Sequence, residues 1–155
     1  MRDAQLVRVQ REAGHQRPLG GILGCFVVAL ELAQAWVESK EEKIACSGWS
    51  TLSSYVALKE DHDLDIDLLK KYLERIEKTI HQAPNRVRYS MNNFMIALGC
   101  YVSELTEEAL NTAKKIGKVS VNMNGTACKV PFAPDYIAKA MKMGRIGKKR
   151  KTAIC

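Results

Sequence analysis

The sequence predicts an all-α protein built from successive antiparallel helix pairs, an α-solenoid fragment, with an irregular basic tail at its C-terminal end. Two observations support this fold class. Apolar residues recur at steps of three and four through most of the chain, as on the buried side of an amphipathic helix. The stretches between these segments are short, which places consecutive helices side by side and antiparallel.

Length and composition are those of one folded domain: 155 residues, of which 46% are hydrophobic and 26% are charged. The five cysteines are odd in number and far apart, and no Cys or His pair has the spacing of metal ligands. We therefore expect free thiols, no metal, no cofactor and a cytoplasmic location.

Residues 1–30 are assigned to no element, because Pro18 and several glycines interrupt them. The basic stretch from Arg2 to Arg17, the apolar run Leu19 to Leu30 and the small residues of Ala33 to Ala35 together resemble a secretion signal. The apolar run is shorter than the roughly 20 residues that a membrane span needs. Unpaired cysteines also do not suit an oxidising compartment, so neither secretion nor membrane association is the favoured prediction.

Residues 31–117 are predicted to form HEAT-like helical repeats. The first helix begins at Phe26 or Glu31, and Asp65 and Asn85 are placed to cap the third and fourth helices. Gly117 is placed to end the fifth helix. By their apolar stripes, the five helices cover about 31–39, 45–56, 66–80, 86–99 and 106–116.

Two of the predicted helix pairs, Glu42 to Ile80 and Arg86 to Ile116, follow each other at an offset of about 40 residues, the period of HEAT and armadillo arrays. The small residues around Gly48 predict close helix packing. Trp36 and Trp49 lie at core-compatible positions, so packing is favoured over base stacking. Stacked pairs of this kind offer an extended surface to a long partner.

Residues 118–155 are predicted to hold an irregular segment, a short helix and the basic tail. Asn124-Gly125 is a turn signal, and Pro134 suits the first turn of a helix from about Asp135 to Lys142. Gly144 and Gly147 then break the tail.

The net charge of +7 is concentrated in this last segment. Seven of the 24 basic residues lie between Lys139 and Lys151, which leaves as many basic as acidic residues in the rest of the chain. Such a block predicts a phosphate-backbone partner, with an anionic membrane or a solvated tail as alternatives. Because no aromatic residue interrupts the tail, we expect it to bind phosphate without reading base sequence.

Two charged motifs in the helical region each have a functional and a structural interpretation. The alternating aspartates from Asp61 to Asp67 begin like a calcium loop, but Ile66 stands at the required glycine and Tyr72 at the required glutamate, so a solvated loop and helix cap are favoured. Arg86 and Arg88 lie in the opening turn of a helix, where the dipole favours anions. Either a phosphate meets them, or they pair with Glu74 or Glu77.

Several segments together resemble a subgroup of the DNA alkylation repair family of HEAT-like repeat proteins. The longest is IHQAPNRVRYSMNN at 80–93, and shorter ones are ACSGWSTL at 45–52, GTACKVP at 125–131 and GRIGKKRK at 144–151. The resemblance covers roughly the last 120 residues. It implies an α-solenoid whose concave basic face holds duplex DNA and, in active members, excision of alkylated purines helped by a carboxylate that stabilises the sugar cation.

The resemblance and the charge pattern together predict a DNA-binding protein. No catalytic residue can be assigned, because the Trp-Asp motif of the family has no counterpart here, Lys43 to Cys46 replaces its Trp-x-Arg-Arg, and Asn93 stands near a DNA-facing tryptophan. The predicted phosphate contacts are Arg86, Arg88, Lys129, Lys142, Arg145, Lys148, Lys149, Arg150 and Lys151.

Two alternative functions remain at this point: an active alkylpurine DNA glycosylase in base excision repair, and a helical-repeat scaffold for protein partners. A scaffold would have basic residues interrupted by acidic ones in its groove. Because the first 30 residues do not resemble the family, we also expect a shortened member whose exposed N-terminal helix face supports self-association.

Overall fold

The computed structural model describes residues 21–125 and 129–152, with side chains from residue 27 onward, and its regular structure in these ranges is entirely helical. The fold class predicted from the apolar periodicity is thus confirmed as all-α. The helices are α2 (Gly21–Val37), α3 (Glu42–Leu58), α4 (Ile66–Thr79), α5 (Asn85–Tyr101), α6 (Thr106–Ile116) and α7 (Ala133–Lys142), with single 3₁₀ turns η1 (Asp61–Asp63) and η2 (Ser103–Leu105).

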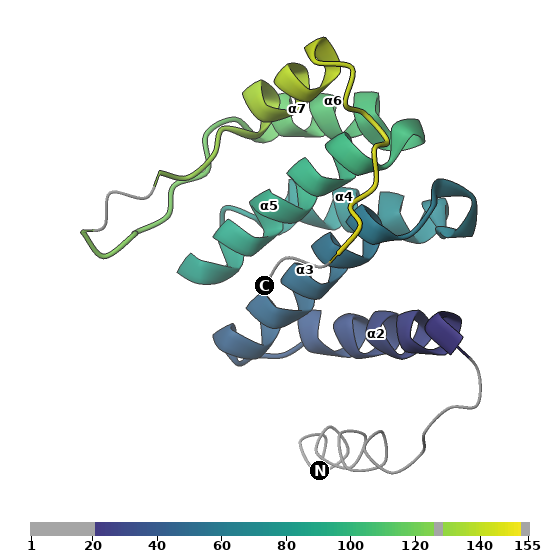
Figure 1. The fold of residues 1–155 in the computed structure, drawn as a ribbon. Helices are drawn as coiled ribbons and strands as arrows, with labels where there is room; N and C mark the ends of the chain where they lie inside the picture. The colour runs from purple at the N-terminus through teal and green to yellow at the C-terminus, as the bar shows by residue number, and fades with distance from the viewer. Residues whose placement is uncertain (1–20, 126–128, 153–155) are drawn as a thin grey trace.

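The helices are arranged in stacked, antiparallel layers (Figure 1). Helices α3, α5 and α7 lie side by side in one layer, and α4 and α6 lie behind them. Helix α3 packs between α2 and α5, while α5 also contacts α6 and α7. The chain therefore alternates between the layers, as expected of repeated helix pairs.

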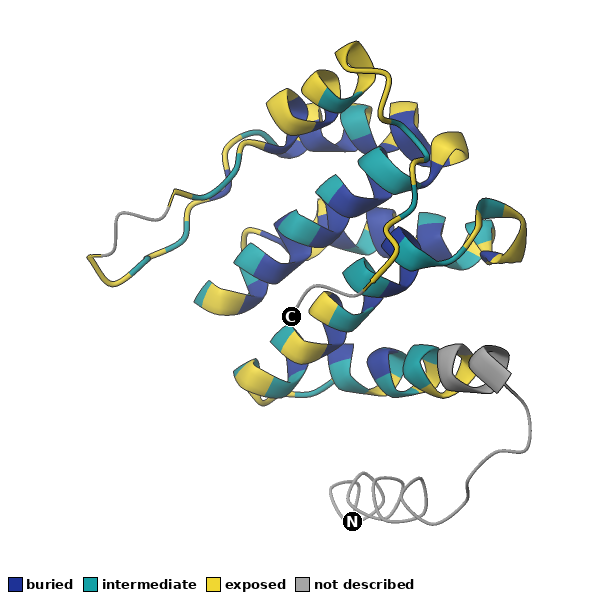
Figure 2. Ribbon diagram, in the orientation of Figure 1, coloured by how far each residue is buried: buried dark blue, intermediate teal, exposed yellow. Residues whose placement is uncertain are grey.

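The core lies between the layers, where the buried faces of the helices meet (Figure 2). At its centre, Trp49 of α3 stands 5.6 Å from Tyr72 of α4 and 5.5 Å from Phe94 of α5, measured between ring centroids. These edge-on and tilted contacts are geometries that aromatic pairs favour. Trp49 is 1% exposed, which confirms the predicted packing role, whereas Trp36 is only half-buried.

Close packing around Gly48 is also confirmed. A Cβ atom at this position would lie 2.7 Å from the backbone nitrogen of Val37 and 3.0 Å from the carbonyl oxygen of Ala33. Both are backbone atoms of α2, which cannot rotate away. Helices α2 and α3 can approach this closely because residue 48 has no side chain.

Two helix starts differ from the predicted ones. Helix α2 begins at Gly21, earlier than Phe26, so Gly24 lies inside a helix that it was expected to interrupt. The Asn85 cap was also wrong. Asn85 is the first residue of α5, and its amide instead donates to the carbonyl oxygen of Asn122 at 2.8 Å and accepts from the Asn122 backbone N–H at 2.7 Å.

The predicted caps at Asp65 and Gly117 are confirmed. An Asp65 carboxylate oxygen accepts the Leu68 N–H at 3.0 Å, and Gly117 follows α6 with a φ of 68°. Beyond Gly117 the chain leaves the helices as an irregular segment, described at residues 118–125 and 129–132, which we call the arm (Figure 1). The predicted turn at Asn124-Gly125 is present, with φ values of 50° and 74°.

Some predictions fall outside the described residues. They include the secretion-signal alternative for residues 1–20 and the thiols of Cys25, Cys128 and Cys155. The thiols of Cys46 and Cys100 are free. In the described ranges, no helix is long and apolar enough to cross a membrane.

Candidate nucleic-acid interface

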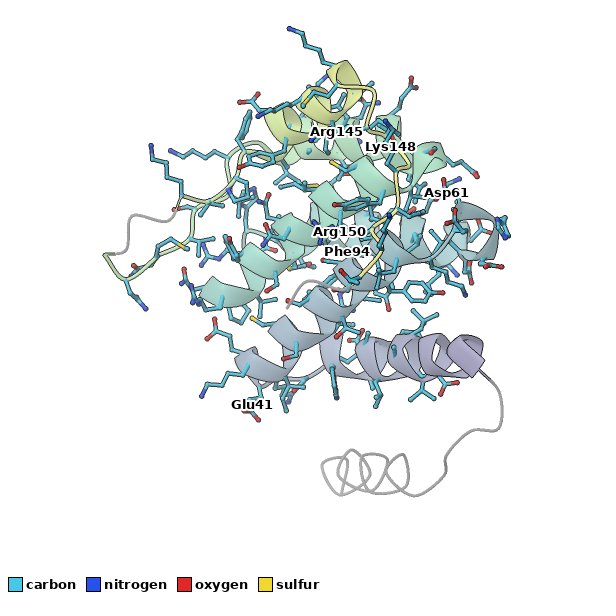
Figure 3. All side chains as sticks on the ribbon, in the orientation of Figure 1. Glu41, Asp61, Phe94, Arg145, Lys148 and Arg150 are labelled. Atoms are coloured by element: carbon cyan, nitrogen blue, oxygen red, sulfur yellow. The ribbon has the colours of Figure 1, made fainter. Side chains whose placement is uncertain are left out.

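The basic tail is docked on the helices rather than extended into solvent. After α7 it crosses α5 toward α3, and Arg145, Lys148 and Arg150 follow one another along it (Figure 3). Two backbone hydrogen bonds hold it there: Gly147 N–H donates to the Cys100 carbonyl at 3.0 Å, and Arg150 N–H donates to the Ala57 carbonyl at 2.7 Å. We call residues 145–150 the strap.

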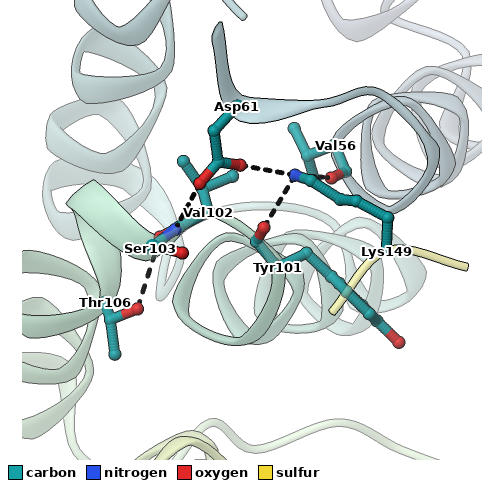
Figure 4. Close-up of polar contacts among 7 residues, drawn as sticks. All are labelled: Val56, Asp61, Tyr101, Val102, Ser103, Thr106 and Lys149. Atoms are coloured by element: carbon teal, nitrogen blue, oxygen red, sulfur yellow. Dashed lines mark hydrogen bonds and ion pairs between the residues drawn. The ribbon is translucent and has the colours of Figure 1, made fainter. Parts of the chain in front are cut away.

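Lys149 is the anchor of the strap (Figure 4). Its ammonium donates to the carbonyl oxygens of Tyr101 at 2.7 Å and Val56 at 3.0 Å, and it forms an ion pair with Asp61 Oδ1 at 2.6 Å. The last carbonyls of a helix lack intrahelical partners and carry the negative end of the helix dipole. One buried cation, with its side chain 8% exposed, therefore caps α3 and α5 together.

Asp61 completes this anchor from the loop before α4. Its Oδ2 atom accepts the backbone N–H of Ser103 at 3.0 Å, so one carboxylate joins the strap to η2. Burial by itself would raise the pKa of Asp61, but the Lys149 ammonium and the Ser103 N–H outweigh it and hold this pKa below its ordinary value.

The strap needs glycine at position 147. Its φ is +72°, in the region that favours glycine, and a Cβ atom would lie 2.3 Å from Ser103 Oγ. Three residues later in the strap, Arg150 lies over the ring of Tyr101 at 5.0 Å and donates from Nε to the Tyr101 hydroxyl at 2.6 Å. The guanidinium is thus held in place and still exposed to solvent.

Beside the strap, a groove of about 450 Å³ opens between α3, α5 and α7. Serines of α3 form one wall and residues of α5 form the floor, while the start of α7 and Arg150 close the rim. Its lining residues are Ser50, Ser53, Ser54, Asn93, Ile96, Ala97, Cys100, Tyr101, Pro131, Tyr136 and Arg150.

The two arginines at the start of α5 have different surroundings. Arg88 donates from Nε to the Ala83 carbonyl at 2.8 Å and from Nη1 to the Ser120 carbonyl at 3.0 Å, which ties the arm to α5. The Arg86 side chain is exposed, but its backbone N–H already donates to Glu42 Oε1 at 2.6 Å. The Glu42 carboxylate of α3 therefore already accepts from a backbone N–H at the start of α5. Phosphate binding to the N–H groups of this helix start was one of the two predicted alternatives.

The alternative partners proposed for these arginines are engaged elsewhere. Glu74 pairs with Lys78 at 3.8 Å, and Glu77 pairs with Lys115 at 3.3 Å. The remaining predicted phosphate contacts are exposed, namely Lys129 on the arm, Lys142 at the end of α7, and Arg145, Lys148 and Lys151. The structure thus brings Arg150 to the groove, leaves Lys148 exposed on the strap and turns Lys149 inward.

The opposite layer of the molecule holds a second depression, and its lining is mainly acidic. A cleft of about 800 Å³ lies over α4, η2 and α6, and carboxylates dominate its charged lining. Those lining residues are Glu74, Glu77, Glu104, Glu107 and Glu108, with Lys114 and Lys115 as the basic ones. The groove beside the strap has Arg150 as its charged lining residue, so the two depressions differ in sign.

Several residues of this interface were not predicted to belong to it. Asp61 was interpreted as part of a solvated loop, and Ser50 and Tyr136 were given no role in binding. Ser50 and Asn93 had a signal only through segments that resemble the family. Among the described residues, which include the aspartate-rich loop, no group of three or more His, Cys, Asp or Glu side chains is placed to hold a metal ion.

The fold and the groove define the class of protein: stacked helical repeats with a basic strap docked across them. No protein-family model matches the chain. A solved structure described as "a new family of proteins related to the HEAT-like repeat DNA glycosylases with affinity for branched DNA structures" has a similar fold. Its TM-score is 0.72 at 29% identity, over 84% of this chain and 59% of that one, so the fold is a HEAT-like repeat.

Two sequence relatives come from Listeria. The chain is 40% identical over 112 residues to an uncharacterized protein of Listeria monocytogenes, and 39% identical over 112 residues to one of Listeria innocua. Each match covers 72% of this chain and 47% of the relative. The chain thus spans about half the length of the curated relatives that it matches.

Proposed function

We propose that the chain is a DNA-binding HEAT-like repeat protein of the DNA alkylation repair family. Its α3–α5–α7 face and strap hold the phosphate backbone of duplex or branched DNA. The observation that carries the proposal is the docked strap, which fixes Arg150 at the rim of a groove without carboxylates in its described lining. The affinity for branched DNA in the description of the related solved structure agrees with it.

The distribution of charge favours this function over a scaffold for protein partners. A scaffold groove was expected to alternate basic and acidic residues, whereas here the described carboxylates of the second cleft lie on the opposite layer. Association with DNA releases counterions from the phosphates, and exposed cations on one face are suited to that. Exposed Arg86, Lys129, Lys142, Arg145, Lys148 and Lys151 would supply most of this attraction.

The proposed function is binding of DNA without excision of a base. Stabilising a sugar cation requires a carboxylate beside the reacting nucleotide. The described groove lining provides hydroxyls, an amide and a guanidinium for this surface, and no carboxylate. Arg88 and Lys149 are given structural roles, because carbonyls and Asp61 already take their donors.

The test is the salt dependence of duplex binding, measured by fluorescence anisotropy. Deleting residues 139–151 would also remove the caps of α3 and α5, so point substitutions are needed. The double variant Arg145→Gln/Lys148→Gln should weaken binding and lower the slope of log affinity against log salt by about two, since each lost phosphate contact contributes about one unit.

The matched control is Lys78→Gln/Lys114→Gln, which removes the same charge from the opposite layer of α4 and α6. It should leave the slope close to that of the wild type. Equal losses in both double variants would show that only net charge matters. Binding that is absent, or insensitive to salt, would refute the proposal.

Self-association through the N-terminal helix face stays a prediction. Val27 and Val28 of α2 are 51% and 41% exposed, a small apolar surface. Sedimentation equilibrium of the wild type and of Val27→Ser/Val28→Ser over a range of concentrations measures it. A monomer at all concentrations would refute self-association.

A further inference from the structure

The groove beside the strap has the chemistry of a small-ligand site rather than of a flat phosphate-binding surface. Its lining includes apolar side chains at Ile96, Ala97 and Pro131 together with hydroxyl and amide groups. A volume of about 450 Å³ lies in the range of sites that enclose one small molecule, roughly 300–1,000 Å³. Electrostatic contact with a duplex backbone does not require such a depression.

Tyr136 gives the groove an exposed aromatic surface. It lies in the first turns of α7, lines the groove and is 56% exposed. Large aromatic side chains are usually buried, so an exposed one in a concave site suggests a stacking partner. The other lining tyrosine, Tyr101, is different: the Arg150 guanidinium already lies 5.0 Å from the centre of its ring.

The polar groups suit the edge of a nucleobase. Asn93 of α5 supplies both a donor and an acceptor, and the exposed Ser50 of α3 supplies a hydroxyl from the facing wall. These groups are neutral and can both donate and accept, so they can form hydrogen bonds with bases that differ in their pattern of donors and acceptors. At the rim, Arg150 offers a fixed positive charge where the phosphate of that nucleotide would lie.

We propose that this groove accepts one unpaired nucleotide of a bound DNA, with its base stacked on Tyr136, its edge at Asn93 and Ser50, and its phosphate at Arg150. A base within an intact duplex is already stacked between its neighbours and cannot enter. The inference rests on the proposed DNA-binding function and adds to it a preference for DNA that contains unpaired nucleotides.

The experiment compares two probes of the same length, a perfect duplex and that duplex with a short single-stranded thymidine gap. Wild-type protein should bind the gapped probe more tightly. Tyr136→Ala should weaken binding of the gapped probe about ten-fold, the order expected for loss of one stacked base, and so abolish the preference for that probe over the duplex. Tyr136→Phe keeps the ring and should retain the preference.

Thermal unfolding of the variants checks their folding, because Tyr136 is exposed and its truncation should not move the melting temperature. Equal affinity of the wild type for both probes would overturn the inference and leave the proposed function intact. An equal loss on both probes in Tyr136→Ala would overturn it as well. If the wild type binds neither probe, the proposed function and the inference both fail.

Discussion

Lys149 shows how one residue of a basic run can differ from its neighbours. Lys148 and Lys151 are exposed, whereas the Lys149 ammonium lies among the carbonyls of Val56 and Tyr101 and the Asp61 carboxylate. Carbonyls at helix ends need donors, and a cation there also meets the negative end of each dipole. Lys149 therefore contributes to stability and not to the exposed charge of the tail.

Lys149→Met should destabilise the fold because it leaves two helix-end carbonyls without this donor and Asp61 without its cation. Breaking a fully buried ion pair costs about 3–5 kcal/mol, but Asp61 is 35% exposed, so we expect a loss of about 1–3 kcal/mol at neutral pH. Urea unfolding measures the change. Lys148→Met, the exposed neighbour, should alter the free energy of unfolding by less than about 0.5 kcal/mol.

The stabilisation by this ion pair should also depend on pH. The pKa of Asp61 is lower in the folded protein than its ordinary value of about 3.9. Its contribution is therefore complete above that ordinary value and is lost as the pH falls through the folded one. The difference in unfolding free energy between wild type and Lys149→Met should shrink from pH 6 to pH 3. A difference that stays constant would exclude the ionised Asp61 as the partner.

At the scale of elements, helices were predictable where local patterns decide them. The apolar ridge from Ile66 to Ile80 and the Asp65 cap predicted α4 almost to the residue. The start of α5 was not predictable in the same way. Asn85 has the side chain of a cap, but the backbone of Asn122 on the arm offers its amide two hydrogen bonds at once.

The strap is the element that the sequence could not reveal. Gly144 and Gly147 predicted a broken tail, and the charges predicted phosphate, but the docking partners of Lys149 lie 48 and 93 residues away. Local spacing carries no information on such contacts. The groove was hidden for the same reason, because its walls come from α3, α5, α7 and the strap.

The α2–α3 contact gives a prediction at this scale. Gly48→Ala would put a methyl group within 2.7 Å of the Val37 backbone nitrogen, so the helices must separate. Overpacking of this kind destabilises by about 1–3 kcal/mol. This exceeds the stabilisation of about 1 kcal/mol that alanine gives over glycine through its helix propensity. Chemical denaturation should show the loss. Ser50→Ala, one half-turn away and exposed, is the control, and an unchanged stability in Gly48→Ala would contradict the tight α2–α3 contact.

At the scale of the whole molecule, the strap and the cleft over α4 and α6 differ in charge. The described lining of the groove beside the strap has an arginine and no carboxylate, whereas five glutamates and two lysines line that cleft. Such a separation orients the molecule in the field of a polyanion. Asp61 is an acidic residue beside the basic strap, and its carboxylate holds the strap in place.

Asp61→Asn distinguishes this positioning role from simple electrostatics. The change removes a negative charge near the proposed DNA face, so electrostatics alone predicts tighter binding. Both partners of Asp61, the Lys149 ammonium and the Ser103 N–H, are donors, and an asparagine amide has one acceptor oxygen for them. The strap should therefore loosen, and Arg150 and Lys148 should lose their fixed positions.

We expect Asp61→Asn to weaken duplex binding by about five-fold, as for the loss of one or two phosphate contacts, although its net charge is more positive. Asp63→Asn is the matched control, because Asp63 lies in the same 3₁₀ turn and its ion pair is with His62. It should bind DNA as well as the wild type or slightly better. Anisotropy titrations at one salt concentration decide the matter, since tighter binding by both variants would mean that Asp61 acts only through its charge.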